Sequence, residues 1–299
     1  MTTSSAPVVT LDGLTVRYGR TTAVNGISLK VPRGSVYGLL GRNGAGKTST
    51  VRCLLGQWKP TGGSAALFGA DVWRHRSRLM SRVGVVLERD ESPQSMTASQ
   101  LGRFFAALYP RWDRTSFVDR LDRFSVPPDR PFGTMSRGQQ RQLSLALALA
   151  PSPELLVLDD PTLGLDAVAR REILDELIGE LADRGTTVFV ATNDIAGLEP
   201  VADRVGVIHG GDLVVDEGVD ELKARFRRIR IRDSREIDPR FDGAEILRSR
   251  RIAGGVEVVV RVRRGELPPD GRDSDLEVHP MSLEEIFVAL CGPDNGGAP

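Results

Sequence analysis

Short apolar runs and amphipathic segments alternate along the first two thirds of the chain. Two continuous apolar runs, at 155–158 and 187–191, predict parallel strands that are buried on both faces. The segment 35–40 predicts a short apolar strand that ends in a glycine-rich turn. Two further runs, 205–208 and 213–215, flank a Gly-Gly turn and predict a hairpin. Because helical segments separate most of these runs, the pattern favours an α/β fold with a mainly parallel sheet.

Apolar positions at helical spacing dominate the segment from about residue 90 to 150. Two stripes recur there at intervals of three and four residues, behind a Thr97/Gln100 capping box and behind Asp113. The first stripe is Leu101, Phe104, Phe105 and Leu108, and the second is Phe117, Val118, Leu121 and Phe124. We interpret both stripes as core rather than ligand-binding faces, and we expect a helical insertion here.

Charge separates a smaller C-terminal region from the rest of the chain. The 299 residues hold 40 basic and 40 acidic side chains, so net charge does not indicate a partner such as nucleic acid. Residues 223–264 nevertheless carry 14 basic and 6 acidic residues, and residues 265–299 carry 1 and 8. We therefore expect a main domain at 8–222 and an accessory domain at 223–291. Residues 1–7 and 292–299 are expected to be flexible ends.

The accessory domain has a mixed pattern of strands and a helix. Phe226, Ile229 and Ile231 alternate with arginines and predict a strand, and 256–262 predicts another. An apolar helical face follows Ser282, which can form a capping box with Glu285. A small α+β extension fits this pattern, with its arginines on a solvated sheet face.

Composition excludes several other classes of protein. Two cysteines and three histidines cannot supply a disulfide framework or a metal centre built on those residues. No apolar run exceeds six residues, so we expect no membrane-spanning segment. The small, polar first residues do not resemble a secretory signal, so a cytoplasmic protein is expected.

A glycine-rich segment provides the clearest chemistry. Residues 41–48, Gly-Arg-Asn-Gly-Ala-Gly-Lys-Thr, match the phosphate-binding pattern G-x-x-x-x-G-K-[ST] between a strand and a helix. Glycines let successive backbone N–H groups point at phosphates, and the helix N-terminus adds its positive end. In this pattern Lys47 reaches the terminal phosphates and Thr48 ligates Mg²⁺. The strand at 155–158 ends in Asp159, which is suited to the same metal ion.

Further motifs in the same order resemble the nucleotide-binding subunit of an ATP-binding cassette (ABC) transporter. The resemblance covers about residues 8–222 and includes Tyr18 ahead of the phosphate loop. Met135-Ser136-Arg137-Gly138-Gln139 is similar to the family signature LSGGQ, with Arg137 in place of a glycine. Ser136 and Gln139 can also form a capping box at a helix start, which favours an anion site. Gly164-Leu165-Asp166 resembles the loop that faces the second subunit of the dimer.

The resemblance implies a fold, cofactors and site residues. The fold is a P-loop NTPase core of the ABC type, with an antiparallel β portion and the helical insertion. The cofactors are ATP and Mg²⁺, with the metal ion at Thr48, Asp159 and Glu88. The residues placed on ATP are Tyr18, Gly41, Asn43, Gly44, Ala45, Gly46, Lys47, Thr48, Ser49 and Asp159, with Ser136, Gly138 and Gln139 on the ATP of the opposite subunit.

The resemblance also implies partners. A second cassette completes the ATP sites, as a homodimer or a heterodimer. An integral-membrane permease is docked by the helical insertion and the Glu88 loop, on the inner face of the membrane. The C-terminal segment 279–290 resembles the closing helix of bacterial exporter-type cassettes that are encoded apart from their permease. The function implied is therefore ATP hydrolysis that powers an exporter.

Three positions depart from the family pattern near the expected catalytic centre. Asp160 stands where the family has a catalytic glutamate, and its carboxylate reaches about 1.5 Å less far. Asn193 replaces a histidine and cannot carry charge. Glu88 replaces a glutamine, for which Gln94 is a second candidate. We expect Asp160, Asn193 and Glu88 to be the catalytic residues if the chain hydrolyses ATP.

These departures leave alternatives open. One is a catalytically degenerate subunit whose intact signature completes the active site of a different, consensus cassette. Another is a catalytically inactive subunit that senses ATP or sequesters a drug. A third is a soluble ABC ATPase acting on ribosomes or DNA, although the chain shows neither a second cassette nor a long coiled coil.

Overall fold

The computed structural model describes residues 6–89, 91–232, 244–262, 271–273 and 276–292, and within 181–183 and 271–273 the backbone alone. The chain divides into two compact units, Met1–Asp216 and Glu217–Pro299. This division lies a few residues before the composition shift near residue 222, because the helix that precedes the shift packs within the second unit. Residues 1–5 and 293–299 of the expected flexible ends lie outside the described residues.

A six-stranded sheet forms the centre of the first unit, in the order β10-β9-β3-β8-β7-β6. Neighbouring strands from β9 to β6 pair in parallel, and every residue of β3, β7 and β8 is buried. The strands are β3 (Val36–Gly41), β6 (Val83–Val86), β7 (Leu155–Asp159), β8 (Thr187–Thr192), β9 (Arg204–His209) and β10 (Asp212–Gly218). The apolar segments 35–40, 155–158 and 187–191 therefore predicted the buried strands β3, β7 and β8 correctly. A parallel strand that is covered on both faces has no polar face.

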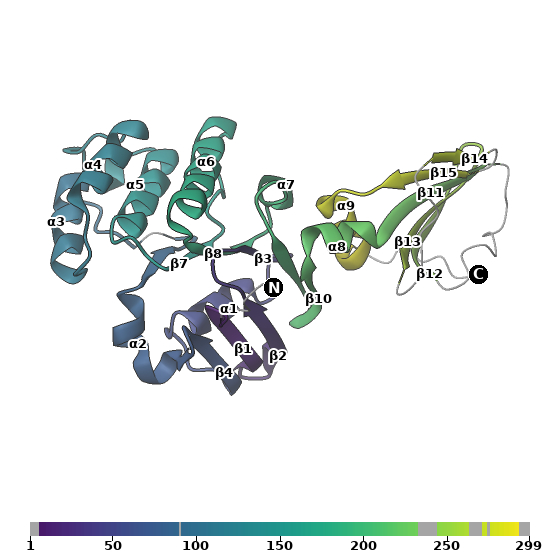
Figure 1. Ribbon diagram of the computed structural model, residues 1–299, viewed down its shortest axis with the longest axis horizontal. Helices are drawn as coiled ribbons and strands as arrows, with labels where there is room; N and C mark the ends of the chain where they lie inside the picture. Colours follow the sequence, from purple (N-terminus) through teal and green to yellow (C-terminus); the bar gives the residue numbers. More distant parts are fainter. Residues whose placement is uncertain (1–5, 90, 233–243, 263–270, 274–275, 293–299) are drawn as a thin grey trace. The chain divides into compact units, whose positions relative to one another are not determined.

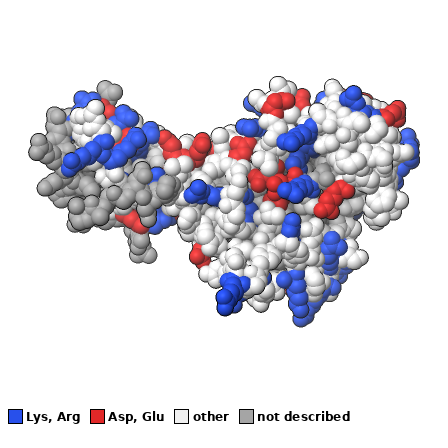
Figure 2. Space-filling view, turned by 180° about the vertical axis from the view of Figure 1, so that it is seen from behind, with Lys and Arg blue, Asp and Glu red and all other residues white. Residues whose placement is uncertain are grey.

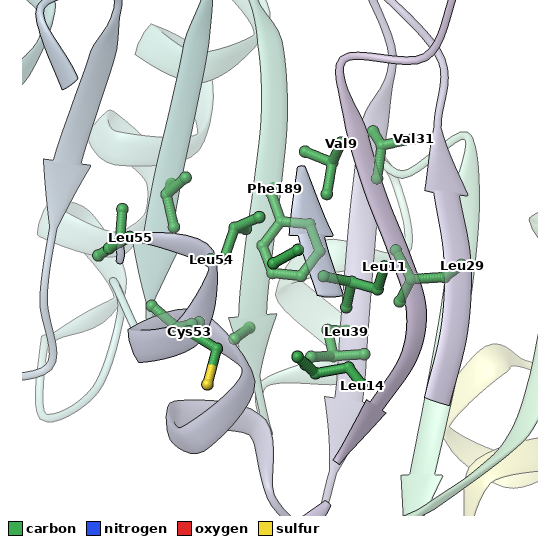
Figure 3. Close-up of a cluster of buried hydrophobic side chains, with 14 of the residues drawn as sticks. Val9, Leu11, Leu14, Leu29, Val31, Leu39, Cys53, Leu54, Leu55 and Phe189 are labelled. Carbon is green, nitrogen blue, oxygen red and sulfur yellow. The ribbon is translucent and has the colours of Figure 1, made fainter. Parts of the chain in front are cut away.

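A smaller antiparallel sheet supplies the β portion that the sequence resemblance implied. Its order is β2-β1-β4-β5, with β1 (Val9–Tyr18), β2 (Thr21–Val31), β4 (Gly62–Leu67) and β5 (Ala70–Asp71). The helix α1 (Lys47–Leu54) joins the buried side chains of both sheets in one core. Figure 3 shows this core, in which Leu54 of α1, Leu11 of β1 and Leu39 of β3 gather around Phe189 of β8.

Helices occupy the segment that was expected to be a helical insertion (Figure 1). They are α3 (Ala98–Leu108), α4 (Arg114–Arg123) and α5 (Arg137–Leu149), with a 3-10 turn at Phe132–Thr134. The capping residues expected at Thr97, Asp113 and Ser136 are all confirmed. The first unit also contains α2 (Val72–Met80), α6 (Ala167–Arg184) and α7 (Ile195–Leu198).

The expected core role of the two apolar stripes is wrong in part. Phe104 and Leu108 are 54% and 58% exposed, and Val118 is 43% exposed. The reason is that α3 packs through the side of the helix that carries Gly102. A Cβ on Gly102 would lie 2.5 Å from the Phe117 ring. This close approach buries Leu101 and turns Phe104 and Leu108 toward solvent.

The described part of the second unit is an antiparallel sheet with two helices. The strand order is β12-β13-β11-β15-β14, and the core consists of branched residues such as Ile229, Ile231 and Val258. The elements are α8 (Val219–Ala224), β11 (Phe226–Arg232), β12 (Ala244–Ile252), β13 (Gly255–Val262), β14 (Gly271–Asp273), β15 (Leu276–Pro280) and α9 (Leu283–Cys291). The expected strands and the Ser282/Glu285 capping box are confirmed.

Arg228, Arg230 and Arg232 of β11 alternate with the buried Ile229 and Ile231, and Figure 2 shows basic side chains on the C-terminal unit. Most of them are paired. Arg230 and Arg250 both bind Glu257, at 3.1 and 2.7 Å, and Arg261 binds Glu245 at 2.7 Å. Such partly exposed pairs are typical of a solvated sheet face.

In the described part of the chain, none of the helices combines the length and the apolar character that crossing a membrane requires.

Candidate functional site

The phosphate loop connects β3 to α1, as the sequence predicted. Gly44 and Gly46 have φ angles of +80° and +114°, a region that favours glycine, and Gly46 is the N-cap of α1. A Cβ on Gly46 would lie 2.4 Å from the backbone oxygen of Ala23, so a larger residue does not fit. At Gly44 a Cβ would meet no atom within 4 Å, because the loop opens there into a cavity.

Lys47 is the buried cation of this loop, at 5% exposure. Its Nζ donates a hydrogen bond to the backbone oxygen of Gly41 at 2.9 Å. Ala45 is buried beneath the loop, and its backbone N–H donates to the oxygen of Arg42 at 3.0 Å. These contacts hold the loop curled around the Lys47 side chain. A backbone loop that is curled in this way can bind an anion.

One cavity of about 300 Å³ collects most of the predicted site residues. It combines the phosphate loop with residues from three later segments of the chain, namely Glu88, Asp160 and Asn193. The loop residues in its wall are Arg42, Asn43, Gly44, Gly46, Lys47, Thr48 and Ser49. A neighbouring cavity of about 640 Å³ shares Thr48 and Glu88 and adds Asp159 and Trp58.

Thr48 and Asp159 present oxygen atoms side by side. The Thr48 hydroxyl donates to Asp159 Oδ1 at 3.4 Å, and Asp159 is 2% exposed. The pKa of Asp159 is raised to about 6, chiefly by burial and also by the charges of Asp160 and Glu88. The Thr48 hydrogen bond and the charge of Lys47 act in the opposite direction. A divalent cation at these oxygens would relieve the repulsion between the carboxylates, so the donor set fits Mg²⁺.

Asp160 and Asn193 are held together at the ends of neighbouring strands. Asp160 follows β7, is 7% exposed, and has an unusual φ of +44° for a residue that is not glycine. Its backbone N–H donates to the oxygen of Ala191 at 2.7 Å, and its Oδ1 accepts from the Asn193 N–H at 3.1 Å. The Asn193 side chain donates to Asn43 Oδ1 at 3.2 Å, which joins this strand end to the phosphate loop.

Tyr18 lies beside the loop, as expected for a ring that stacks on a base. It is 44% exposed, and its hydroxyl donates to Ser49 Oγ at 3.3 Å. The ring also packs edge-on against Trp58, with centroids 5.2 Å apart. Trp58 was not among the residues predicted from the sequence, although an aromatic residue shortly after the helix of the phosphate loop could have indicated it.

The signature residues are not brought to this cavity. Ser136 caps α5, with its Oγ accepting from the Gln139 N–H at 3.2 Å, while Gln139 Oε1 accepts from the Ser136 N–H at 3.2 Å. Neither they nor Gly138 line the phosphate-loop cavity. A Cβ built on Gly164 would lie 3.5 Å from the guanidinium of Arg137, so the signature lies beside the Gly164–Asp166 loop of its own chain.

Comparisons with known proteins agree with this geometry. Residues 24–163 match the family model described as "ABC transporter". A relative is the bacitracin transport ATP-binding protein BcrA of Enterococcus faecalis, 35% identical over 74% of this chain and 72% of that protein. Another is the daunorubicin/doxorubicin resistance ATP-binding protein DrrA of Streptomyces peucetius, 30% identical over 98% of this chain and 94% of that protein.

A solved structure agrees as well. CbiO1 of Clostridium perfringens, part of an ABC transporter complex, is 26% identical and has a TM-score of 0.63, covering 73% of this chain and 91% of that one. The fold, the phosphate-loop cavity and the relatives all agree. The chain therefore belongs to the ABC transporter family, as an ATP-binding and ATP-hydrolysing subunit.

Proposed function

We propose that the chain hydrolyses Mg²⁺·ATP in the phosphate-loop cavity and thereby powers an exporter whose membrane-spanning part is a separate permease. The observation that carries the proposal is the cavity itself. It brings Lys47, Thr48, Glu88, Asp160 and Asn193 together from distant parts of the sequence. Hydrolysis of a phosphoanhydride depends mainly on positioning and on charge stabilisation, and this constellation supplies both.

Each residue has a distinct part in this proposal. The exposed ring of Tyr18 stacks on the base, and Lys47 with the loop N–H groups neutralises the phosphates. Thr48, Asp159 and Glu88 offer oxygen atoms to Mg²⁺, which supplies further neutralisation of phosphate charge when bound. Asp160 accepts a proton from the attacking water, and Asn193 hydrogen-bonds a phosphate oxygen.

A second copy of the chain completes the site. Ser136, Gly138 and Gln139 form an anion-binding helix start that lies outside the chain's own cavity. We propose that it docks on ATP held by the other cassette. If Asp160 and Asn193 prove too weak for turnover, the same signature serves a different, consensus cassette, and this chain holds ATP without hydrolysing it.

The permease binds the helical insertion on the inner face of the membrane. Phe104 and Leu108 form an exposed apolar patch on α3, which a soluble protein usually covers with a partner. Two further relatives are named for export, one for Nod factor export and one for fluoroquinolones export, and these names support export rather than import. In this arrangement the chain is cytoplasmic and peripheral.

Light scattering of the purified chain tests the dimer. The expected result is a monomer without nucleotide and a dimer with Mg²⁺·ATP, when Asp160→Asn is used to slow hydrolysis. Ser136→Arg should keep ATP binding, measured by fluorescence of Trp58 beside Tyr18, but lose the dimer. An ATP-dependent dimer that survives Ser136→Arg would contradict the proposed docking of the signature.

A further inference from the structure

The end of β6 leaves backbone groups that the sheet does not pair. β6 is an edge strand among the described residues, and its ladder with β7 stops at Val86. The next two residues, Leu87 and Glu88, carry the chain into the nucleotide cavities. Backbone carbonyl groups at such a point need donors from elsewhere in the fold.

Arg141 supplies these donors from α5. The guanidinium nitrogen Nη1 donates a hydrogen bond to the backbone oxygen of Leu87. A second nitrogen, Nη2, donates to the backbone oxygen of Glu88 at 2.8 Å. A guanidinium group is planar and has donors in a fixed fork, so it can hold two successive carbonyl groups at once. A lysine has a single nitrogen at the end of its chain and cannot reproduce this fork.

The clamp fixes the position of a residue that faces the nucleotide site. Glu88 lines the cavity with Lys47 and Asp160, and also the cavity with Thr48 and Asp159. Its charge is close enough to raise the pKa of Asp159. Because Arg141 holds the backbone of Glu88, the Glu88 side chain remains available to these cavities.

The same helix begins at the signature. Ser136 caps α5 and Arg141 lies in its second turn, so one rigid helix carries both the anion-binding start and the clamp. The Arg141 hydrogen bonds therefore tie the position of this helix to the backbone of Leu87 and Glu88.

We propose that Arg141 is a positioning residue for ATP hydrolysis, which holds the Glu88 segment against the signature helix. This inference rests on the proposed function. It predicts that loss of the clamp lowers the rate of the chemical step and leaves ATP binding nearly unchanged, because Tyr18, Lys47 and Thr48 are not touched.

The test compares Arg141→Gln, Arg141→Lys and the control Arg103→Gln, an exposed arginine of α3. For Arg141→Gln we expect kcat to fall by about tenfold to a hundredfold, as misplacement by about 1 Å can cause. KM for ATP should stay within about twofold. Arg141→Lys should recover only part of kcat, and Arg103→Gln should match the native chain.

Hydrogen exchange of the segment 83–89 without nucleotide gives a second measurement, which does not depend on catalysis. Exchange should be faster in both Arg141 variants and unchanged in Arg103→Gln. If Arg141→Gln does not fold, Arg141→Lys carries the test alone. Native kcat and native exchange in a folded Arg141 variant would overturn the inference. An inactive native chain with faster exchange in the variants would instead contradict the proposed function and leave the clamp established.

Discussion

The carboxylate of Asp160 accepts a hydrogen bond from the backbone N–H of Asn193 at 3.1 Å. This bond joins the ends of β7 and β8, the strands that precede two of the three residues departing from the family pattern. It leaves the second carboxylate oxygen of Asp160 available to accept a proton in the cavity. The short side chain is thus held in one position at the edge of the nucleotide site.

Asp160→Asn tests the proton-accepting role of this carboxylate. An amide keeps the size and one acceptor oxygen, but it cannot take a proton, so we expect kcat to fall by about 10²- to 10⁴-fold. KM for ATP should change by less than about twofold. Steady-state phosphate release measures both constants, with the exposed Asp119→Asn as a matched control. A native kcat in Asp160→Asn would show that another group accepts the proton.

A buried ion cluster between α4 and α6 gives a prediction about stability. Arg120, Glu176 and Glu180 are each at most 6% exposed; Arg120 Nε lies 2.7 Å from Glu176 Oε1, and Arg120 also binds Glu180. Arg120→Met leaves two glutamates in a buried site, so we expect a loss of about 3–5 kcal/mol in the free energy of unfolding. Urea denaturation measures it.

The matched control for this cluster is the exposed pair Arg171–Asp175, at 3.0 Å on α6. Its side chains are 78% and 55% exposed, so Arg171→Ala should cost less than about 0.5 kcal/mol. Equal losses for Arg120→Met and Arg171→Ala would contradict the buried cluster.

The lowered pKa of Glu154 leads to a prediction of how the stability of the protein depends on pH. Hydrogen bonds from Arg82, at 2.6 and 2.7 Å, and a further one from Arg33 together lower the pKa of Glu154 to about 2. Since the folded-state pKa lies below the ordinary value, the stabilisation is complete above about pH 4.5 and is lost as the pH falls toward 2. The Tm difference between the native chain and Glu154→Gln should therefore be largest near neutral pH and shrink through this range. A difference that stays constant down to pH 2.5 would count against the Arg82 contact.

Substitution by alanine should have opposite effects on stability at two glycines. A Cβ on Gly206 of β9 would lie 2.3 Å from the hydroxyl of the buried Tyr37. Gly206→Ala should therefore lower the free energy of unfolding by about 1–3 kcal/mol. Gly179 lies inside α6 with no atom within 4 Å of a Cβ, so Gly179→Ala should gain about 0.5–1 kcal/mol. Thermal unfolding measures the two changes, and the same sign for both would contradict this packing.

The sequence predicted features that depend on neighbours along the chain. The phosphate loop, the strand ending at Asp159 and the Ser136/Gln139 capping box are local patterns, and the structure contains each of them. The interpretation of Phe104 and Leu108 as core failed, because helical spacing defines an apolar face without showing which part of it is covered. The close contact of Gly102 with Phe117 determines which part of the apolar face of α3 is covered.

Contacts between distant segments could not be read from the sequence. The bond between Asp160 and Asn193, and the clamp of Arg141 on Leu87 and Glu88, join residues that lie far apart in the chain. An arginine in a helix has no local pattern that shows which carbonyl groups it will meet. The fold alone brings these groups together.

Steady-state ATP hydrolysis by the purified chain tests the central claim most directly, beside Lys47→Ala and the double variant Asp160→Glu/Asn193→His. We predict Mg²⁺-dependent hydrolysis by the native chain and at least about a hundredfold loss in Lys47→Ala, since removing a charge from the transition state is costly. Native turnover equal to that of Lys47→Ala would contradict the account. A silent native chain that binds ATP, beside an active double variant, would also contradict it and would identify a degenerate subunit of a heterodimer.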